Sequence, residues 1–266
     1  MKRNIYSLGL AIVILMTAGL RVQAIVTLNS DVSNYTFENG VTYLIANTIT
    51  ISGTTTIQGG AIIKYASGAS INADDLVCPT SSGTPAILTS MNDDTVGATI
   101  PGSNHSPTYS DYGAALNFAR NTITTVKNLN ISYADTGLYF LATVGDYEAT
   151  NYVQNVVIEH CGGSAIFNIQ DLYSSDPYLI LSDSVIDDIA GTALSGDFWR
   201  GYANNITVSN ANLCEDTGYG YEDLYITNSK FDTITEEDFE DIGLYLSGDN
   251  NGFHDSDPFG TDSYSY

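Results

Sequence analysis

Short stretches in which apolar and polar residues alternate recur along most of the chain. In the segment 43–73 the alternation is almost strict, and it is interrupted at Gly53, at Gly59-Gly60 and at Gly68. A period of two residues is typical of half-buried β-strands, and apolar positions at helical spacing are absent. The pattern therefore predicts an all-β protein whose short strands are joined by tight turns.

The strands belong to a repeated unit. Two segments that begin at Asn128 and Asn155 share one layout, in which the Asn is followed by alternating apolar positions, a corner of small residues and a second apolar pair. The second apolar pair returns at a constant step, from Leu138 to Ile166 and from Ile166 to Leu194. Self-similarity at a fixed period of this length is the signature of a solenoid.

Two or three short strands per unit, without a helical pattern, predict a parallel β-helix with coils of about 22–28 residues. One coil cannot bury its inner face alone, so successive coils stack about 4.8 Å apart around a continuous apolar column. The separation in sequence between Leu194 and Leu244 fits two such coils. The predicted inner column comprises Ile131, Leu138, Ile158, Ile166, Ile186, Leu194, Val208 and Leu244.

The Asn that starts each unit has two interpretations. In one, Asn128 and Asn155 stack as an asparagine ladder at a corner, and their side chains bond between coils. In the other, each Asn is an independent turn residue.

Three cysteines are too few for a disulfide framework. Cys161 and Cys214 occupy matching places in the repeat, and their separation in sequence corresponds to two coils. Two coils place the Cα atoms about 9.6 Å apart, beyond the limit of about 7 Å for a disulfide. We therefore expect that these two cysteines are not bonded to each other.

One segment in the first half of the chain carries a family resemblance. "GGAIIKYASGASI" (59–71) resembles the "G-x-x-I-K-F-x-x-G-A-x-I" coil of secreted bacterial surface β-helix proteins. Over roughly residues 40–247 the chain is similar to the pectin-lyase-like superfamily. The resemblance implies that the chain folds as a right-handed single-stranded parallel β-helix. It also implies that the protein belongs to the non-catalytic, surface-type members of this superfamily. These motifs specify architecture well and activity poorly.

The chain divides into three parts. Residues 1–24 have a charged start, an apolar run and a small-residue cleavage site, which predicts a secretory signal; an uncleaved anchor is the alternative. Residues 25–248 form the predicted β-helix domain, with a loop excursion at about 78–112 that is either a binding face or a tolerated insertion. The acidic residues 249–266 are predicted to be disordered or to form a loose cap.

The charge of the chain limits its partners. Removal of residues 1–24 takes away three of the eight basic residues and none of the 31 acidic residues, which changes the net charge from −23 to −26. Such a surface repels nucleic acid and anionic lipid, because few cations are present to neutralise phosphates. We expect no nucleic-acid partner, no membrane span after signal cleavage, and a secreted, cell-surface or periplasmic location.

Enzymes of the superfamily that this chain resembles act on acidic polysaccharides. The chain contains only some of the residue types that form their catalytic sites. Asp187 and Asp188 resemble the paired acids of the hydrolases, and adjacent carboxylates can raise one pKa and create a general acid. Consecutive strand residues point to opposite faces, however, so the alternative is two separate turn acids. Arg200 is the best basic candidate for a lyase, and its alternative is stacking on Trp199 or Tyr202.

No cofactor is predicted, with calcium as the alternative. Calcium binds six to eight oxygen atoms and favours loops rich in Asp and Gly. The candidate ligands are Asp93, Asp94, Asp255 and Asp257, and none of them fits a spaced calcium consensus.

The expected function is a secreted or cell-surface β-helix scaffold that is a candidate binder of neutral glycans and has no catalytic activity. The tyrosines of the chain recur through the repeated units. On an outer side of the β-helix their rings would provide stacking platforms for sugars. The alternative is that they pack between strands, because Tyr is a favoured strand residue. The expected partners are extracellular polysaccharide or envelope components. The alternative function is a divergent polysaccharide lyase or glycoside hydrolase that acts on extracellular polysaccharide.

Overall fold

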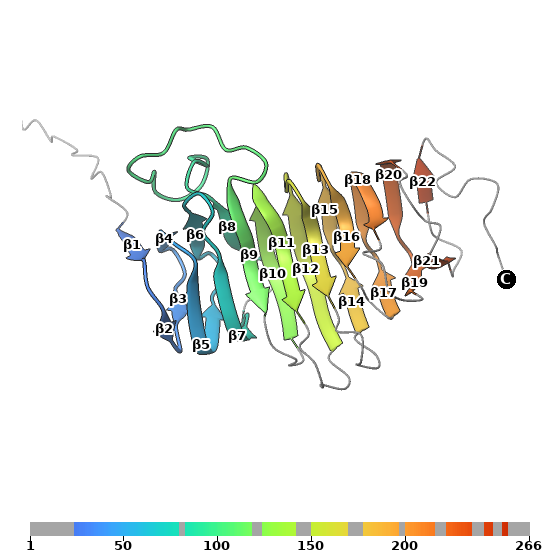
Figure 1. Ribbon diagram of the computed structural model, residues 1–266, viewed down its shortest axis with the longest axis horizontal. Helices are drawn as coiled ribbons and strands as arrows, with labels where there is room; N and C mark the ends of the chain where they lie inside the picture. The colour runs from blue at the N-terminus through green and yellow to red at the C-terminus, as the bar shows by residue number, and fades with distance from the viewer. Residues whose placement is uncertain are drawn as a thin grey trace, which may run out of the picture.

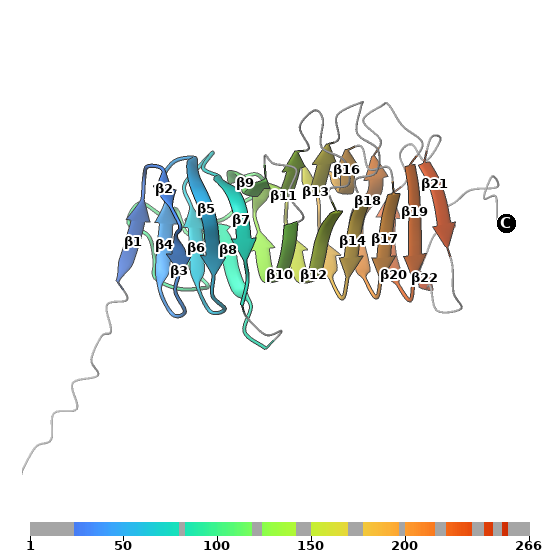
Figure 2. The same cartoon turned by 90° about the horizontal axis from the view of Figure 1, so that it is seen from below.

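The computed structural model describes residues 24–79, 83–118, 124–141, 150–169, 178–196, 200–215, 222–235, 242–246 and 252–254. Within these residues every regular element is a β-strand, and the strands pair in parallel. No helix in the described chain is long and apolar enough to cross a membrane. The strands stack along one long axis, from β1 at one end to β22 at the other (Figures 1 and 2). The predicted parallel β-helix is confirmed.

The strand pairings form three series, which we call faces 1, 2 and 3. Face 1 begins with four whole strands: β1 (Ile25–Leu28), β4 (Thr42–Ile45), β6 (Ile62–Tyr65) and β8 (Ala86–Ser90). It continues with the second halves of β10 (Thr124–Ser132) and β12 (Thr150–Glu159), and then with β15 (Val185–Asp187). The last members of face 1 are the starts of β18 (Thr207–Glu215) and β20 (Lys230–Thr235), and the strand β22 (Gly252–His254). Face 2 contains β2 (Val32–Ser33), the starts of β5 (Ile49–Ile57) and β7 (Ile71–Val77), β9 (Tyr112–Phe118), β11 (Ala134–Leu141), β13 (Ser164–Ile169), β16 (Thr192–Gly196) and the ends of β18 and β20. Face 3 contains β3 (Thr36–Phe37), the ends of β5 and β7, the first halves of β10 and β12, β14 (Tyr178–Ser182), β17 (Arg200–Asn204), β19 (Glu222–Thr227) and β21 (Ile242–Leu246).

Coil length changes along the axis. Ile25 pairs with Thr42 at the start of the stack, whereas Val157 pairs with Val185 further along, so a later coil contains many more residues than the first. The predicted length thus fits the later coils and is too long for the first. The early coils turn through single left-handed residues such as Gly53, whose φ is +73°, and a tight corner of this kind shortens the coil.

The inner column is confirmed for seven of its eight predicted members. Side chains no more than 1% exposed are Ile131, Leu138, Ile158, Ile166, Ile186, Leu194 and Val208. The placement of Leu244 in line with Leu194 is wrong, because β21 pairs Leu244 with Leu224 on face 3. Leu194 lies on face 2 and pairs with Cys214 in the next coil. The separation in sequence between Leu194 and Leu244 therefore joins residues on two different faces and does not measure a whole number of coils.

The same register corrects the placement of two cysteines. Cys214 matches Leu194 in the stack, whereas Cys161 follows the corner residue His160. The two cysteines therefore do not occupy matching places. Cys161 has a free thiol, so it is not bonded to Cys214, as predicted.

Residues with positive φ line the two corners that flank face 1. At the first corner, between faces 3 and 1, Asn128 and Asn155 have φ of 58° and 52°, and Asn155 Nδ2 donates to Asn128 Oδ1 over 2.8 Å. The asparagine ladder is confirmed for this pair. Asp183, Asn205 and Asn228 also have positive φ along the same corner, and Asn205 Nδ2 donates to Asp183 Oδ1 over 2.7 Å. The second corner, between faces 1 and 2, is lined by Tyr133, His160, Asp188, Asn210 and Thr233.

A long loop, residues 91–111, leaves the coil after β8 and returns at β9 (Figure 1). We call this loop the excursion. Its first part lies on the outer side of face 1, where the backbone N of Ala98 donates to Thr42 Oγ1 over 3.0 Å. Its last residues lie at the second corner, where the backbone N of Asp111 donates to the carbonyl of Tyr133 over 3.0 Å. The excursion therefore contacts coils that are far apart along the axis.

Candidate functional site

Asp187 and Asp188 contact different coils. Asp187 Oδ1 accepts hydrogen bonds from Ser209 Oγ over 2.7 Å and from Asn210 Nδ2 over 2.9 Å, both on the following coil. Asp188 has a φ of 53° at the second corner and turns to the preceding coil, where its Oδ2 lies 2.6 Å from His160 Nδ1. The two carboxylates therefore do not form a pair.

The surroundings of Asp188 favour its ionised form. The hydrogen bond from the Tyr109 hydroxyl lowers the pKa of Asp188; desolvation opposes this shift, and the contact with His160 adds to it. The same hydrogen bond raises the pKa of Tyr109 to about 12. A general acid in a glycoside hydrolase needs a raised pKa. Asp188 is instead held as an anion that accepts hydrogen bonds.

Arg200 lies on another face from these acids. It begins β17 on face 3, in register with Tyr178 and Asp223, whereas Asp187 belongs to β15 on face 1. The side chain of Arg200, and Trp199, lie outside the described residues. The backbone pairing does not bring Arg200 and Asp187 into one strand series.

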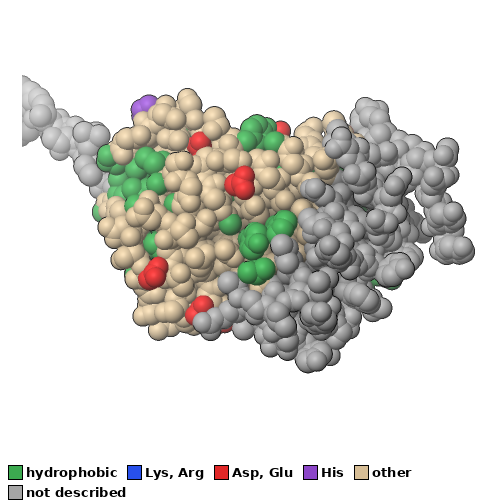
Figure 3. Space-filling view, viewed as in Figure 1, with side chains coloured by type: hydrophobic (Ala, Val, Ile, Leu, Met, Phe, Trp, Pro, Cys, Tyr) green, Lys and Arg blue, Asp and Glu red, His purple; other side chains and the backbone are tan. Residues whose placement is uncertain are grey.

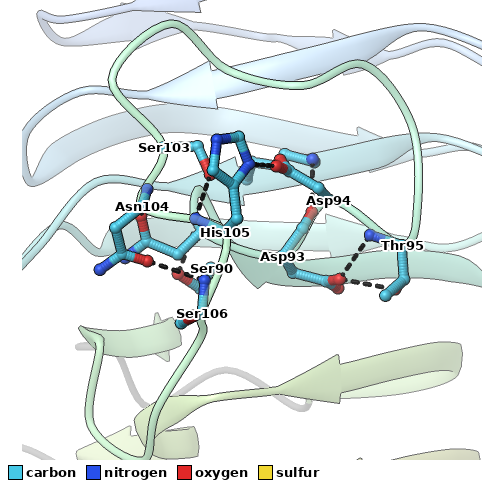
Figure 4. Close-up of polar contacts among 10 residues, drawn as sticks. Ser90, Asp93, Asp94, Thr95, Ser103, Asn104, His105 and Ser106 are labelled. Carbon is cyan, nitrogen blue, oxygen red and sulfur yellow. Dashed lines mark hydrogen bonds and ion pairs between the residues drawn. The ribbon is translucent and has the colours of Figure 1, made fainter.

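The excursion acids Asp93 and Asp94 have neighbours within the protein (Figure 4). Asp93 is buried, and its carboxylate accepts from Thr89 Oγ1 over 2.9 Å and from the backbone N of Thr95 over 2.9 Å. Asp94 contacts the ring of His105, and the hydrogen bond with His105 lowers the pKa of Asp94. The part of the chain that the structure describes contains no group of three or more His, Cys, Asp or Glu side chains placed to hold a metal ion. Two further candidates, Asp255 and Asp257, lie outside it.

Lys64 anchors the excursion to the coil. Its side chain has no exposed surface, and Nζ donates to the backbone carbonyl of Asp93 over 2.6 Å. Burial lowers the pKa of Lys64, and the nearby charges of Asp93 and Asp94 oppose this shift. The basic residue in the family-like coil is therefore a structural one.

Replacement of Lys64 by Met is expected to loosen the excursion without unfolding the β-helix. The Asp93 carbonyl would lose its donor, and an unsatisfied buried carbonyl costs about 1–3 kcal/mol. Backbone amides of residues 93–98 should exchange hydrogen about ten- to a hundredfold faster. Lys230→Met is the control, because the Lys230 side chain is 61% exposed and pairs with Asp232 at the surface over 3.6 Å. Unchanged exchange in the Lys64 variant would contradict the anchor.

Three aromatic rings gather around Asp188 at the second corner. The rings of Tyr133 and His160 stack with centroids 5.3 Å apart and planes 16° apart. Tyr109, from the end of the excursion, meets the His160 ring at 76° with centroids 6.2 Å apart. We call Tyr109, Tyr133, His160 and Asp188 the aromatic corner. Three members of the aromatic corner, Tyr133, His160 and Asp188, recur at nearly equal steps along the chain, so the sequence repeat could have grouped them. Tyr109 lies outside this repeat.

Face 3 presents two side-by-side columns of outward side chains. One column is tyrosine-rich and consists, in register, of Thr125, Tyr152, Ile180, Tyr202 and Tyr225. The other consists of Lys127, Gln154, Ser182, Asn204 and Thr227. These ten side chains include one cation and no acid, although the whole chain has 31 acidic residues. The residues between the columns are buried and face the core: Val126, Val153, Leu181, Ala203 and Ile226.

Comparisons with models of protein families, with curated proteins and with solved structures find no match to this chain. The charges and contacts of its own residues therefore provide the basis for a functional proposal. Acidic side chains on the face shown in Figure 3 lie at scattered positions, and no Lys or Arg appears on the described part of that face.

Proposed function

We propose that the protein is a secreted or cell-surface β-helix scaffold that binds neutral glycans on face 3 and has no catalytic activity. We also propose that it belongs to the right-handed, pectin-lyase-like superfamily. The coil motif at 59–71, the parallel β-helix and the predicted signal at residues 1–24 support these assignments. Mass spectrometry of the exported protein should find an N-terminus at Ile25.

The absence of acids from the two described columns of face 3 is the observation that favours a neutral ligand. Tyr152 and Tyr202 are 38% and 40% exposed and supply apolar surface, while Gln154, Ser182 and Asn204 supply amide and hydroxyl groups beside them. Sugars need this combination, because their rings have an apolar C–H side and their hydroxyls need hydrogen-bond partners. The columns run along the helix axis, which suits an extended polymer.

The stacking of the tyrosines limits how a sugar can bind. The rings of Tyr202 and Tyr225 lie 5.2 Å apart with planes 14° apart, so each covers one side of the other. The column thus offers ring edges and hydroxyl groups along its length. We therefore expect weak binding of a neutral polymer through many small contacts.

A glycan array with the purified protein after signal removal tests this proposal. Tyr202→Ala should weaken binding of a neutral polysaccharide about tenfold, which corresponds to about 1.4 kcal/mol. Tyr139→Ala is the matched control, because Tyr139 stacks on Phe167 with centroids 4.9 Å apart on face 2. Equal losses in both variants, or no neutral glycan bound by the unchanged protein, would refute binding at face 3.

The alternative, a lyase or hydrolase for acidic polysaccharide, makes a different prediction. A uronate polymer is an anion and is repelled by a protein of charge −26. β-Elimination also needs a base and a stabiliser for the developing enolate. We expect no unsaturated product from pectate or alginate with millimolar calcium, measured against a heat-killed control. Product that disappears in Arg200→Ala would establish the lyase instead.

A further inference from the structure

The aromatic corner differs from face 3 in both exposure and charge. Tyr109 is 45% exposed and makes an edge contact with His160 rather than a parallel stack. The side chains of His160 and Asp188 are 37% and 40% exposed. An accessible tyrosine ring therefore stands beside an accessible carboxylate, and this pair is absent from the two described columns of face 3.

The arrangement is held in place from several directions. The ring of Tyr109 makes an edge contact with His160, and His160 Nδ1 lies 2.6 Å from Asp188 Oδ2. Ser110, the next residue, donates from Oγ to Asp135 Oδ1 over 2.9 Å. A carboxylate has about four acceptor positions, so these contacts leave Asp188 able to bind a further partner. The ring of Tyr109 is thus fixed next to the anion before any ligand arrives.

Among the described side chains, carboxylates outnumber cations around the corner, where His160 is the one basic group in contact with Asp188. The pKa of Tyr109 is raised first by its interaction with Asp188 and by burial, and then by the charges of Asp188 and Asp187. The pKa of Tyr133 is raised first by burial, and then by the charges of Asp93, Glu159 and Asp111. Lys64 lies buried beneath the excursion, and Lys127 lies on face 3. The potential at the corner therefore attracts cations, and the protein's overall charge strengthens the attraction at long range.

We propose that the aromatic corner binds an organic ammonium cation, which lies against the ring of Tyr109 and pairs with the carboxylate of Asp188. A cation over an aromatic face is attracted by the ring quadrupole, and recognition of quaternary ammonium groups by aromatic side chains is a known use of this attraction. The ammonium group of an amino sugar and that of choline share this chemistry. The proposal does not depend on glycan binding at face 3.

Titration calorimetry at low salt, with the purified protein after signal removal, tests the site with defined probes. The probes are choline, its uncharged isostere with carbon in place of nitrogen, glucosamine and N-acetylglucosamine. Choline should bind and its isostere should not, because the charge supplies the attraction. Glucosamine binding without N-acetylglucosamine binding would identify an amino sugar as the source of the ammonium group, and choline binding alone would identify a quaternary ammonium group.

Variants locate the site. Asp188→Asn keeps the shape and removes the charge, and Tyr109→Ala removes the ring; each should weaken binding about tenfold or more. Tyr109→Phe keeps the ring and should bind within about threefold of the unchanged protein. Tyr202→Ala is the control on face 3 and should bind normally, which separates this site from the glycan surface. The proposal is overturned if neither cation binds, if the uncharged isostere binds equally well, or if Asp188→Asn binds normally while its melting temperature is unchanged.

Discussion

Ile186→Asp is expected to prevent folding. Ile186 is 1% exposed and lies between Ile158 and Val208 in the inner column of face 1. A carboxylate at this position would be buried among apolar side chains without a partner, which costs about 4–5 kcal/mol or more. The total stability of a domain is only about 5–15 kcal/mol. Soluble yield and the thermal unfolding transition measure the effect.

The neighbouring Val185→Asp is the matched control. Val185 is in the same strand, but it is 37% exposed and points away from the core. The variant should fold and lose no more than about 1 kcal/mol, from the lower strand propensity of Asp. Similar stability of the two variants would show that the register of β15 is wrong by one residue.

A steep loss of stability above about pH 10 is the second large effect that we expect. Tyr65 and Tyr112 are fully buried, stack with centroids 4.4 Å apart, and donate to the carbonyls of Ala115 over 2.8 Å and Ser132 over 3.0 Å. Burial raises the pKa of both hydroxyls well above the ordinary value of about 10. In the unfolded chain both groups lose their protons near pH 10, while the native protein retains them.

The native state therefore binds more protons than the unfolded state above this pH, so the free energy of unfolding falls as the pH rises. Two groups give a slope of up to about 2.7 kcal/mol per pH unit. Lys64 acts in the opposite direction, because its lowered pKa makes its contribution rise with pH, but only up to about pH 10.5.

Urea unfolding at a series of pH values measures this slope. The double variant Tyr65→Phe/Tyr112→Phe should be less stable near neutral pH, because it lacks two hydrogen bonds, and should show a shallower decline above about pH 10. An unchanged slope in the double variant would exclude these two tyrosines as its cause.

The sequence predicted the parts of the fold that depend on local repetition. Alternation revealed the strands, and a constant step placed Leu138, Ile166 and Leu194 in one column, because each coil must put an apolar side chain over the one below. The same step placed Leu244 wrongly, because coil length changes along the chain and Leu244 lies on face 3, not on face 2 with Leu194. Periodicity alone does not reveal such a change.

The candidate sites were harder to predict because they combine residues that are distant in sequence. Tyr109 meets Asp188 through the path of the excursion, which no repeat encodes. Asp187 and Asp188 are neighbours in sequence and resemble a catalytic pair, yet the corner φ at Asp188 directs the two carboxylates to different coils. The columns of face 3 arise from residues on successive coils, and their lack of acids becomes visible only when the strands are in register.

The excursion also changes how the protein should unfold. In a solenoid each coil contacts only its neighbours, so unfolding can begin at one end and spread as a series of small steps. Here one loop bonds to Thr42 and packs Tyr109 against His160, and these two contacts lie four coils apart, or about 19 Å along the axis. Opening any coil between them strains both attachments. The loop thus adds long-range cooperativity, and the spanned coils should melt as one block whose boundaries are set by the loop's two ends.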